Sequence, residues 1–374
     1  MKVLFVSDTH LGLDLPARPR VTRRRRGGDF FRNFELALEP ALRGEVDVVL
    51  HGGDLLHRSK VPAWLAEAAL APLKRVASIG VPVLLVPGNH ERAKLPYPLL
   101  ALHEHLHVFD RPRTVVLEAG GLRVAFAGFP YARKVRARFG ELLSATGHHE
   151  AAADVRVLCF HHCVEGSTCG PGDFTFRSGD DVIRRAELPR DFSIVLSGHI
   201  HRHQVMPGVP SVVYPGSVER TSFAEAPETK GYVVLELSRA GVGIEFRALP
   251  ARPMVTRLLT HGGLSGSQVR QRLAALIDST PADAVVQVRL EGPPSAEVLP
   301  ELSAAAVRRV SGRRNVSVLL PRFALPPGVS PTAQLVDEAR AQLSLNLGAQ
   351  LPRTPARAAS SSSTGPSASC RTAP

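Results

Sequence analysis

Side chains that commonly bind divalent metals follow five of the apolar runs in this sequence. They are Asp8 and His10, Asp54 and His57, Asn89 and His90, His161 and His162, and His199 and His201. Imidazole and carboxylate groups suit borderline cations such as Mn²⁺, Fe²⁺ and Zn²⁺, and one carboxylate can bridge two of them. Two such ions about 4 Å apart can clamp both the attacking and the leaving oxygen of a phosphoryl transfer. These residue types at these places therefore indicate a two-metal phosphoesterase site.

The apolar runs themselves are typical of strands buried on both faces, because they are continuous rather than alternating. They cover residues 2–7, 46–52, 81–88, 122–128, 155–161, 192–198, 211–216 and 231–237. Between them, apolar residues at helical spacing predict helices over 29–42 and 62–79. Alternating strands and helices predict a layered α/β fold, in which ligands bind outside the carboxyl ends of the strands. We therefore expect the five strand ends to deliver their polar side chains into one crevice.

The character of the sequence changes after residue 245. Two strand-like runs, at 252–261 and 283–292, enclose a helix-like segment at 266–279, which predicts a small α+β, cap-like unit over 246–325. A C-terminal helical segment is expected over 326–350, with its helix at 331–345. The Ser-, Ala- and Pro-rich tail over 351–374 is expected to be disordered. The metal-binding domain then covers 1–245.

Charge and hydropathy restrict the classes of partner. The chain carries 46 Lys and Arg against 34 Asp and Glu, which gives a net charge of +12. A pI near 10.3 favours a polyanion such as nucleic acid, and an arginine-rich composition without such a partner is the alternative. No apolar run approaches the roughly 20 residues of a membrane span, and the N-terminal run is too short for a signal peptide. We therefore expect a soluble, cytoplasmic protein that does not enter a membrane.

Five short motifs occur in a fixed order along the chain. They are SDTH at 7–10, GGD at 52–54, GNHE at 88–91, HH at 161–162 and GHIH at 198–201. With this set, the sequence resembles the calcineurin-like metallophosphoesterases over roughly residues 1–240. Within that superfamily it is similar to the SbcD and Mre-eleven branch of DNA repair nucleases, through DTHLG, HGGDLLHRSKVP, FTFRSGDDVIR, SGHIHRHQ and YPGSVERTSFAE. The resemblance implies the layered metallophosphoesterase fold, with central β-sheets flanked by helices.

The resemblance also implies a ligand set for two divalent metal ions, Mn²⁺ first, with Fe, Zn or Mg as alternatives. It assigns Asp8, His10 and His201 to one ion, Asn89, His199 and one histidine of the HH pair to the other, and Asp54 to both. It implies that His90 protonates or stabilises the leaving oxygen. His57 matches a histidine that lies near the substrate in this branch.

The adjacent histidines 161 and 162 are not equivalent. Related nucleases carry H-Q-x-V at this strand end, so His161 matches the ligand and His162 replaces a glutamine. Neighbouring side chains of an extended chain point in opposite directions, so both are not expected to bind one metal. We predict His161 as the ligand and His162 as an outer or substrate-facing residue, with the reverse assignment still open.

The arginine-rich stretch at 16–28, PARPRVTRRRRGG, departs from the family pattern. We predict that Arg23, Arg24, Arg25 and Arg26 contact substrate phosphates without reading sequence. A solvated loop that binds nothing is the alternative.

The function implied by the resemblance is a two-metal phosphodiesterase, a DNA exonuclease and endonuclease in end processing and repair. An activated water attacks the phosphodiester, and His90 assists the leaving group. A metallophosphoesterase for nucleotides or phosphoproteins is one alternative, and a DNA-binding scaffold with a structural or vestigial metal site is another. The implied partner is a coiled-coil ATPase of the ABC type. Because the helix expected at 331–345 is short, that attachment stays open, as does a homodimer.

The remaining histidines and cysteines carry no pattern for a second site. His148 and His149, like the histidines at 103, 105 and 107, have no partner pattern and are expected on solvated faces or caps. Cys159 lies inside an apolar run and is expected to fill the core.

Overall fold

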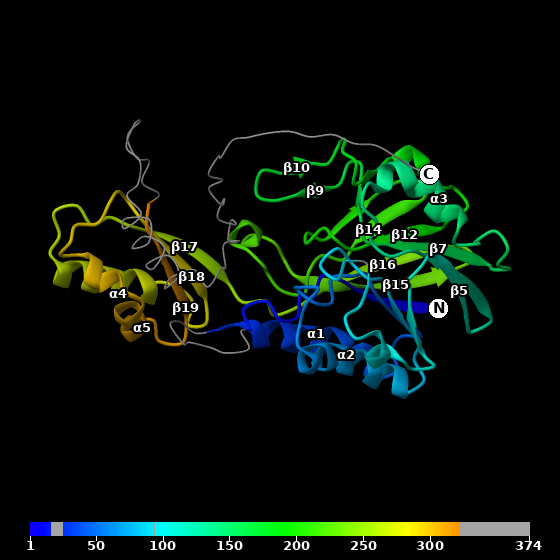
Figure 1. Cartoon of the computed structure of the whole chain (residues 1–374), viewed down its shortest axis with the longest axis horizontal. Coiled ribbons are helices and arrows are strands. Elements are labelled where there is room, and N and C mark those ends of the chain that lie inside the picture. Colours follow the sequence, from blue (N-terminus) through cyan, green and yellow to red (C-terminus); the bar gives the residue numbers. More distant parts are fainter. Residues whose placement is uncertain (16–24, 93, 322–374) are drawn as a thin grey trace, which may run out of the picture. The chain divides into compact units, whose positions relative to one another are not determined.

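The computed structural model of the chain describes residues 1–15, 25–92 and 94–321 (Figure 1). Arg23, Arg24, the helix predicted over 331–345 and the tail from 351 lie outside the described residues. The domain boundaries predicted in that part of the chain therefore stay predictions. Within the described part, no helix combines the length and the hydropathy that a membrane crossing requires.

The first of two large sheets contains the N-terminal strand. Its order is β16 (Gly241–Ala248), β15 (Gly231–Ser238), β1 (Lys2–Val6), β2 (Val48–His51), β3 (Val83–Leu85) and β4 (Leu106–Val108). Strands β1 to β4 run parallel, with Val6 opposite His51, and β15 and β16 extend the sheet antiparallel beside β1. The carboxyl ends of β1, β2 and β3 therefore lie at one edge.

The second sheet also has six strands. Its order is β13 (Gln204–Met206), β14 (Ser211–Tyr214), β12 (Ile194–Ser197), β7 (Val155–Phe160), β6 (Leu122–Gly128) and β5 (Arg113–Ala119). The four inner strands are parallel, and β5 and β13 are antiparallel edges. Both sheets thus bury a parallel centre, as the continuous apolar runs predicted.

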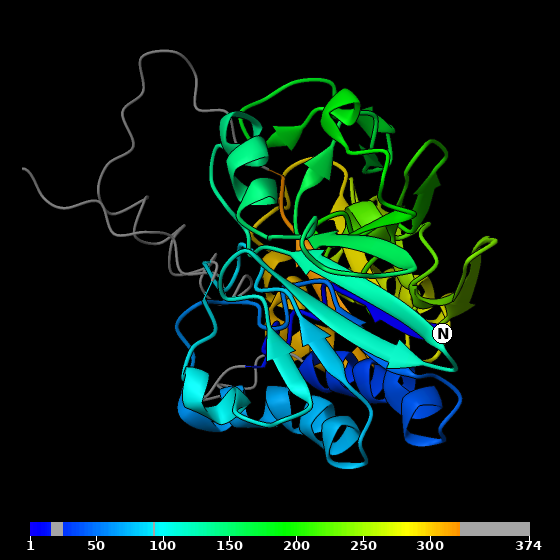
Figure 2. The ribbon, with the colours of Figure 1, turned by 90° about the vertical axis from the view of Figure 1, so that its right-hand side faces the viewer.

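The two sheets form the middle layers of a four-layer α/β/β/α sandwich. Val3 and Phe5 of β1 pack between the sheets against residues such as Val157, whereas Leu4 and Val6 pack on the other face. That outer face is covered by α1 (Gly27–Leu42) and α2 (Ala63–Ser78), and α3 (Val135–Ser144) covers the second sheet (Figures 1 and 2). The predicted layered α/β fold is confirmed.

The helices that cover the first sheet follow their apolar spacing. Phe30 and Phe34 of α1 are fully buried in the cluster under the sheet. Burying each ring contributes about 2 kcal/mol, which fixes the face that α1 presents. Pro62 precedes α2, where a missing backbone N–H costs nothing. Both predicted helices are therefore present, within two residues of the expected ends.

The segment after β16 forms a small unit with its own core. Three parallel strands, β17 (Met254–Leu259), β18 (Val285–Leu290) and β19 (Asn315–Leu319), pack against α4 (Gly266–Asp278) and α5 (Ala304–Val310). The start of α4 is a capping box, because Ser265 Oγ accepts from the Gln268 N–H and Gln268 Oε1 accepts from the Ser265 N–H. The two predicted strands and the helix are confirmed, and the cap-like role of the unit stays a prediction.

The remaining elements are short. Two small ribbons pair β8 (Cys163–Val164) with β11 (Val182–Ile183) and β9 (Thr168–Cys169) with β10 (Phe174–Thr175). The 3₁₀ turns are η1 (Pro98–Ala101), η2 (Arg185–Glu187), η3 (Phe223–Glu225) and η4 (Leu299–Leu302). Helix α3 was not predicted, because only Val135, Phe139 and Leu142 of its ten residues are buried and its apolar pattern is weak.

Candidate metal centre

The seven predicted metal ligands come together at the carboxyl ends of five parallel strands. Asp8 and His10 follow β1, Asp54 follows β2, Asn89 follows β3, His161 follows β7, and His199 and His201 follow β12. Because both sheets present their carboxyl ends to the same place, residues almost 200 positions apart become neighbours. The five strand ends therefore deliver their polar side chains to one place, as predicted.

One part of the cluster joins the ends of β1 and β12. His10 Nε2 lies 2.9 Å from His201 Nε2, and His201 Nε2 lies 3.9 Å from Asp8 Oδ1. These three side chains offer ligand atoms that all lie within 4.8 Å of one another. They are the set that the resemblance assigns to one ion.

The other part joins the ends of β2, β3, β7 and β12. Asn89 Oδ1 lies 3.0 Å from His161 Nε2 and 2.8 Å from His199 Nδ1. Asp54 Oδ2 lies 3.3 Å from His161 Nε2 and 3.9 Å from His10 Nε2. The Asp54 carboxylate thus lies between the two groups, which is the position that a bridging ligand needs.

The electrostatics of the cluster fit divalent cations. Asp8 and Asp54 are buried, and among the described residues their ion-pair partners are histidines rather than Lys or Arg. Burial lowers the pKa of His10 well below its usual value and that of His199 to about 3, so both rings offer lone pairs. Against the effect of burial, the Asp54 carboxylate raises the pKa of His161 to about 9, and Glu225 and Asp8 raise the pKa of His201. The buried carboxylates thus draw positive charge toward the cluster, which a bound cation would supply in place of these protons. The donors are nitrogen and oxygen, which suits borderline divalent metals.

The structure distinguishes His161 from His162. His161 turns Nε2 toward Asp54 and places Nδ1 2.7 Å from the Gly52 carbonyl oxygen, which fixes the ring. His162 points away, and its Nε2 accepts a hydrogen bond from the Ala132 N–H at 3.1 Å. His162 is fully buried and stacks on Tyr131, so the prediction that it faces substrate is wrong. It supports the strand end from behind.

His90 and His57 lie beside the cluster. The His90 backbone N–H donates to Asp54 Oδ1, and His90 Nδ1 lies 2.6 Å from the His57 carbonyl oxygen. A carbonyl only accepts, so the proton is on Nδ1, and Nε2 is the atom left to exchange a proton. The His57 ring lies 5.2 Å from the His90 ring, and burial lowers the pKa of His57 to about 4. Their placement agrees with the roles predicted for them, which stay predictions.

The backbone at the cluster is held in a conformation that most residues avoid. Asp8, His10, Asp54 and His199 have φ values of 53°, 44°, 52° and 82°. Left-handed backbone in a residue other than glycine costs of order 1–3 kcal/mol and persists only where the surrounding structure imposes it. Gly198 shows how tight that surrounding is, since a Cβ there would lie 2.1 Å from Ser7 Oγ and 2.7 Å from His161 Nδ1. The fold therefore holds the predicted ligands in place.

A buried ion-pair group of Glu225 and Lys230, which was not predicted, supports His201. The Nδ1 atom of His201 lies 3.1 Å from Glu225 Oε1, and Lys230 Nζ lies 2.6 Å from Glu225 Oε2. Lys230 also donates to the His201 carbonyl oxygen at 2.9 Å. A carboxylate behind a ligating histidine orients the ring and raises its basicity. The sequence contained one signal for Glu225, the end of the YPGSVERTSFAE stretch, but no role followed from it.

Glu91 is a second residue beside the cluster whose contacts were not predicted. Its carboxylate accepts from the Leu56 N–H at 2.6 Å and the Gly88 N–H at 2.9 Å, and burial raises its pKa to about 8. These bonds tie the loop that carries Asp54 to the loop that carries Asn89. The glutamate of the GNHE motif was visible in the sequence, but its role depends on backbone groups that only the fold brings near.

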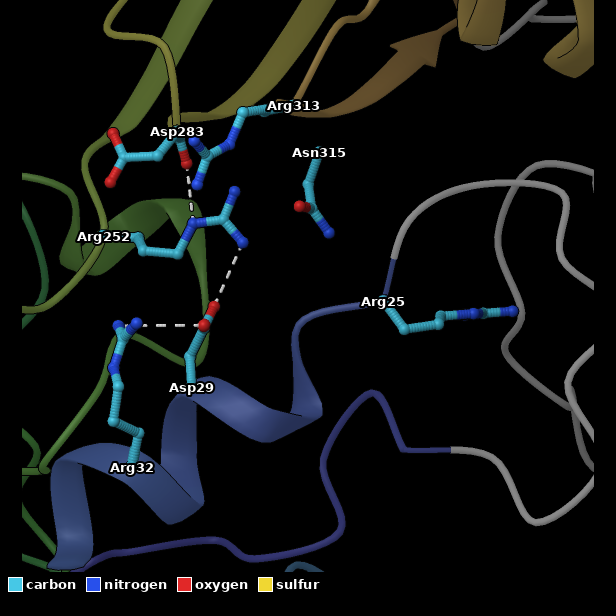
Figure 3. A pocket seen from close by; sticks show the side chains of 7 residues that line it. All are labelled: Arg25, Asp29, Arg32, Arg252, Asp283, Arg313 and Asn315. Atoms are coloured by element: carbon cyan, nitrogen blue, oxygen red, sulfur yellow. Dashed lines mark hydrogen bonds and ion pairs between the residues drawn. The ribbon is translucent and has the colours of Figure 1, made fainter.

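The arginine stretch is only partly described, and what is described corrects one prediction. Arg26 is buried, with its guanidinium on the Arg220 carbonyl oxygen and over the Phe30 ring, so it does not contact substrate. Arg25 pairs with Asp14 at 3.0 Å and lines an open cavity of about 470 Å³. The cavity lining is Arg25, Asp29, Arg32, Arg252, Asp283, Arg313 and Asn315 (Figure 3).

The cavity lining is basic, but part of its positive charge is neutralised by aspartate. In Figure 3, Arg32 and Arg252 both point toward Asp29, whereas Arg25 extends away from Arg252. Arg252 Nη1 lies 3.1 Å from the Asp29 carboxylate, and Arg32 Nη2 lies 3.8 Å from it. The substrate contact predicted for Arg25 therefore stays a prediction.

The chain is similar to several known proteins. A family model described as calcineurin-like phosphoesterase matches residues 1–203. The DNA double-strand break repair protein Mre11 of Haloferax volcanii is 32% identical over 324 residues, which cover 84% of this chain and 68% of that protein. The protein of the same name from Aeropyrum pernix is 29% identical over 266 residues, 67% of this chain and 62% of that protein. A dimetal phosphatase structure from Danio rerio is 12% identical with a TM-score of 0.44, covering 66% of this chain and 96% of that one.

Proposed function

The chain belongs to the calcineurin-like phosphoesterase family, and from this premise we propose that it is a two-metal nuclease whose substrate is DNA. Membership of the family makes it a metal-dependent hydrolase of phosphodiester bonds. The proposal adds the DNA substrate, the number of ions and the roles of individual side chains.

The observation that carries the proposal is the position of Asp54. Its carboxylate lies between a group formed with His10 and a group formed with His161, at 3.9 Å and 3.3 Å. One buried carboxylate with nitrogen donors on both sides is suited to bridge two cations. A single-ion site would not need donors on both sides of it.

The chain's own residues would divide the remaining work. Asp8, His10 and His201 would hold one ion, and Asn89, His161 and His199 the other, with Asp54 shared. When bound, two such ions supply Lewis-acid stabilisation of the phosphoryl oxygens and lower the pKa of the attacking water. His90 keeps its Nδ1 proton on the His57 carbonyl oxygen, so Nε2 is the atom that would give a proton to the leaving oxygen.

The choice of DNA rests on charge and on relatives. A net charge of +12 favours a polyanionic substrate over a small phosphoester. The cavity that includes Arg25, Arg32 and Arg313 adds a basic surface among the described residues. Both relatives named above are described as DNA double-strand break repair proteins.

Mn²⁺ is the ion that we propose. The clusters of ligand atoms found in the described residues contain histidine and aspartate but no cysteine. Thiolate would favour Zn²⁺, whereas imidazole, carboxylate and amide oxygen also suit Mn²⁺ and Fe²⁺.

The test uses the purified full chain with Mn²⁺, labelled DNA and bis-p-nitrophenyl phosphate. Hydrolysis of both substrates, lost in Asp54→Asn, is the expected result. His105→Ala serves as a matched control, because His105 is exposed and lies 3.8 Å from Glu104. Hydrolysis of the small ester without cleavage of DNA would remove the nuclease claim and favour nucleotides or phosphoproteins. No hydrolysis and no bound metal would favour a DNA-binding scaffold.

A coiled-coil ATPase partner also stays a prediction. The segment expected to bind it, at 331–345, lies outside the described residues. Co-purification of the full chain with such an ATPase, and its loss when residues 326–350 are deleted, would test it.

A further inference from the structure

A second group of side chains that could bind a metal lies where the parallel strands of the second sheet begin. We call this side of the sheet its amino edge, and the side where those strands end its carboxyl edge. His148 and His149 occupy the turn between α3 and the start of β7, and Asp191 lies three residues before β12. Because β7 and β12 are parallel neighbours, their amino ends meet just as their carboxyl ends do. The four residues of β12 alone span about 13 Å, so this group is separate from the catalytic centre.

The geometry of the group is compact. Asp191 Oδ2 lies 3.8 Å from His148 Nε2 and 3.9 Å from His149 Nδ1. The three ligand atoms all lie within 4.8 Å of one another. These separations are too long for hydrogen bonds. The two imidazole rings lie against each other, with their centroids 3.7 Å apart, and both direct a nitrogen toward the carboxylate oxygen.

Hydrogen bonding decides which nitrogen of His148 carries the proton. The Thr146 hydroxyl donates its one proton to the Leu143 carbonyl oxygen at 2.6 Å. The same hydroxyl lies 3.1 Å from His148 Nδ1, so toward the ring it must accept. Nδ1 therefore carries the proton, and Nε2 presents a lone pair. A hydrogen bond on one ring nitrogen that frees the other for a metal is the usual arrangement behind a histidine ligand.

Among the described residues, the lone pair of His148 Nε2 has no hydrogen-bond partner. The side chain is only 2% exposed, and Nε2 is a buried nitrogen without a hydrogen bond. It faces the Asp191 carboxylate, which is also an acceptor. Two acceptors directed at one another across 3.8 Å lack the positive charge that would satisfy both.

We propose that His148, His149 and Asp191 form a binding site for a transition-metal ion of the zinc type. Two imidazoles and one carboxylate are a recurring three-donor set for Zn²⁺, and water completes the coordination. His149 is 76% exposed and Asp191 is 39% exposed, so an ion can reach the site from solvent. The buried His148 supplies the fixed donor, and the two exposed side chains close onto the ion.

The bound ion would fasten two distant segments of the chain. Asp191 follows His149 by 42 residues, and no other described ion pair joins these two segments. A metal clip that closes a long loop removes conformational freedom from the unfolded chain. The site is therefore stabilising, and it touches none of the groups that handle the phosphodiester.

A proton shared between His148 and Asp191 is the competing explanation. It would place a hydrogen-bond donor on Nε2, yet 3.8 Å exceeds the length of such a bond. Burial and the neighbouring His149 also lower the pKa of His148, which favours the neutral ring.

The test measures zinc bound per chain at equilibrium, using the full-length protein after treatment with a chelator. Wild type is expected to bind one equivalent more than His149→Ala or Asp191→Asn. His105→Ala is the matched control, because it removes a histidine 3.8 Å from a carboxylate, and this pair belongs to none of the three-ligand groups found in the described residues. It is expected to bind as much zinc as wild type.

Two further measurements keep the result independent of the catalytic centre and of folding. In a His10→Ala/Asp54→Asn background, one equivalent is expected to remain, and adding His149→Ala should remove it. In the presence of chelator, the His149→Ala variant should have the same melting temperature as the wild type, because the His149 side chain is exposed. When zinc is added, only proteins that keep His149 should melt at a higher temperature. Equal zinc content in wild type, His149→Ala and Asp191→Asn, or no zinc-dependent rise in wild type, would overturn the proposal.

Discussion

The two edges of the second sheet gather the same kinds of side chain in different ways. At the carboxyl edge, His161 and His199 lie with Asp54 in a largely buried cluster, and several of the predicted ligands have left-handed backbone. At the amino edge, His148 is buried, but His149 is mostly exposed and Asp191 is partly exposed. Both edges contain histidine and aspartate. These side chains become neighbours because parallel strands bring their ends together.

The difference shows how far each group of side chains is preorganised in the absence of a metal. At the carboxyl edge the fold fixes the ligands, with buried partners such as Glu225 and Glu91 behind them. Backbone strain there is maintained by packing, as functional sites often show. At the amino edge only one donor is fixed, so the ion itself must order the other two. We therefore expect tighter binding at the carboxyl edge and earlier loss of metal from the amino edge in chelator.

The largest effect should come from removing the shared carboxylate. Asp54→Asn leaves the histidines around it in place but removes one of the two carboxylates, Asp8 and Asp54, in the predicted ligand set. Activity should fall at least about a thousandfold, more than the 10- to 100-fold typical of outer partners of a ligand. The measurement is kcat/KM on bis-p-nitrophenyl phosphate. Asp191→Asn at the other edge should leave kcat/KM unchanged, and a comparable loss there would break the distinction between the two edges.

His90→Ala separates chemistry from metal binding at the carboxyl edge. Loss of a proton donor to the leaving oxygen should lower kcat by about 10²-fold or more, whereas metal content should stay at the wild-type value. Single-turnover kinetics and metal analysis on the same sample test this. The substitution should slow hydrolysis of a substrate with a poor leaving group more than hydrolysis of one with a good leaving group. Equal effects on both would show that His90 does not deliver the proton.

Gly198→Ala tests the packing that holds the carboxyl edge. The added Cβ would lie 2.4 Å from the Gly52 carbonyl oxygen and 2.1 Å from Ser7 Oγ. The free energy of unfolding should fall by about 1–3 kcal/mol, and activity should fall with it. Gly140→Ala in α3 is the matched control, because nothing lies within 4 Å of its Cβ position. It should stabilise the helix by about 0.5–1 kcal/mol, and denaturant unfolding measures both.

Glu225→Gln should weaken metal binding rather than chemistry. It removes the carboxylate behind His201 and one charge that compensates the buried Lys230. The Mn²⁺ concentration for half-maximal activity should rise about tenfold, with kcat at saturating metal nearly restored. Glu118→Gln on the exposed edge strand β5 is the control. A lowered kcat that excess metal does not restore would place Glu225 in the reaction itself.

The smallest effect should come from His149→Ala. Hydrolysis with Mn²⁺ should stay within about twofold of wild type, because the site lies at least one strand length from the catalytic cluster. The comparison of initial rates at saturating Mn²⁺ checks this. A larger loss would mean that the two edges are coupled through β7 or β12.

Most of the fold and the ligand set could be predicted because the signals are local. An apolar run followed by a histidine or aspartate is visible in any short window, and five in order define the site. Glu225 could not be predicted in its role, since it lies in a 3₁₀ turn 24 residues after His201. Arg26 was mispredicted because nothing in RRRR shows which guanidinium turns inward onto the Arg220 carbonyl oxygen.

The sequence by itself determined the layered α/β fold and the family, and it predicted the residues that the fold gathers at the carboxyl ends. Residue type and order are sufficient for these, because parallel strands always present their carboxyl ends to one edge. Only the tertiary structure decided that His161 rather than His162 faces the cluster, because strand twist and packing choose the side. It alone brought Asp191 to His148 and His149. Those residues carry no shared pattern along the chain, and only the pairing of β7 with β12 makes them neighbours.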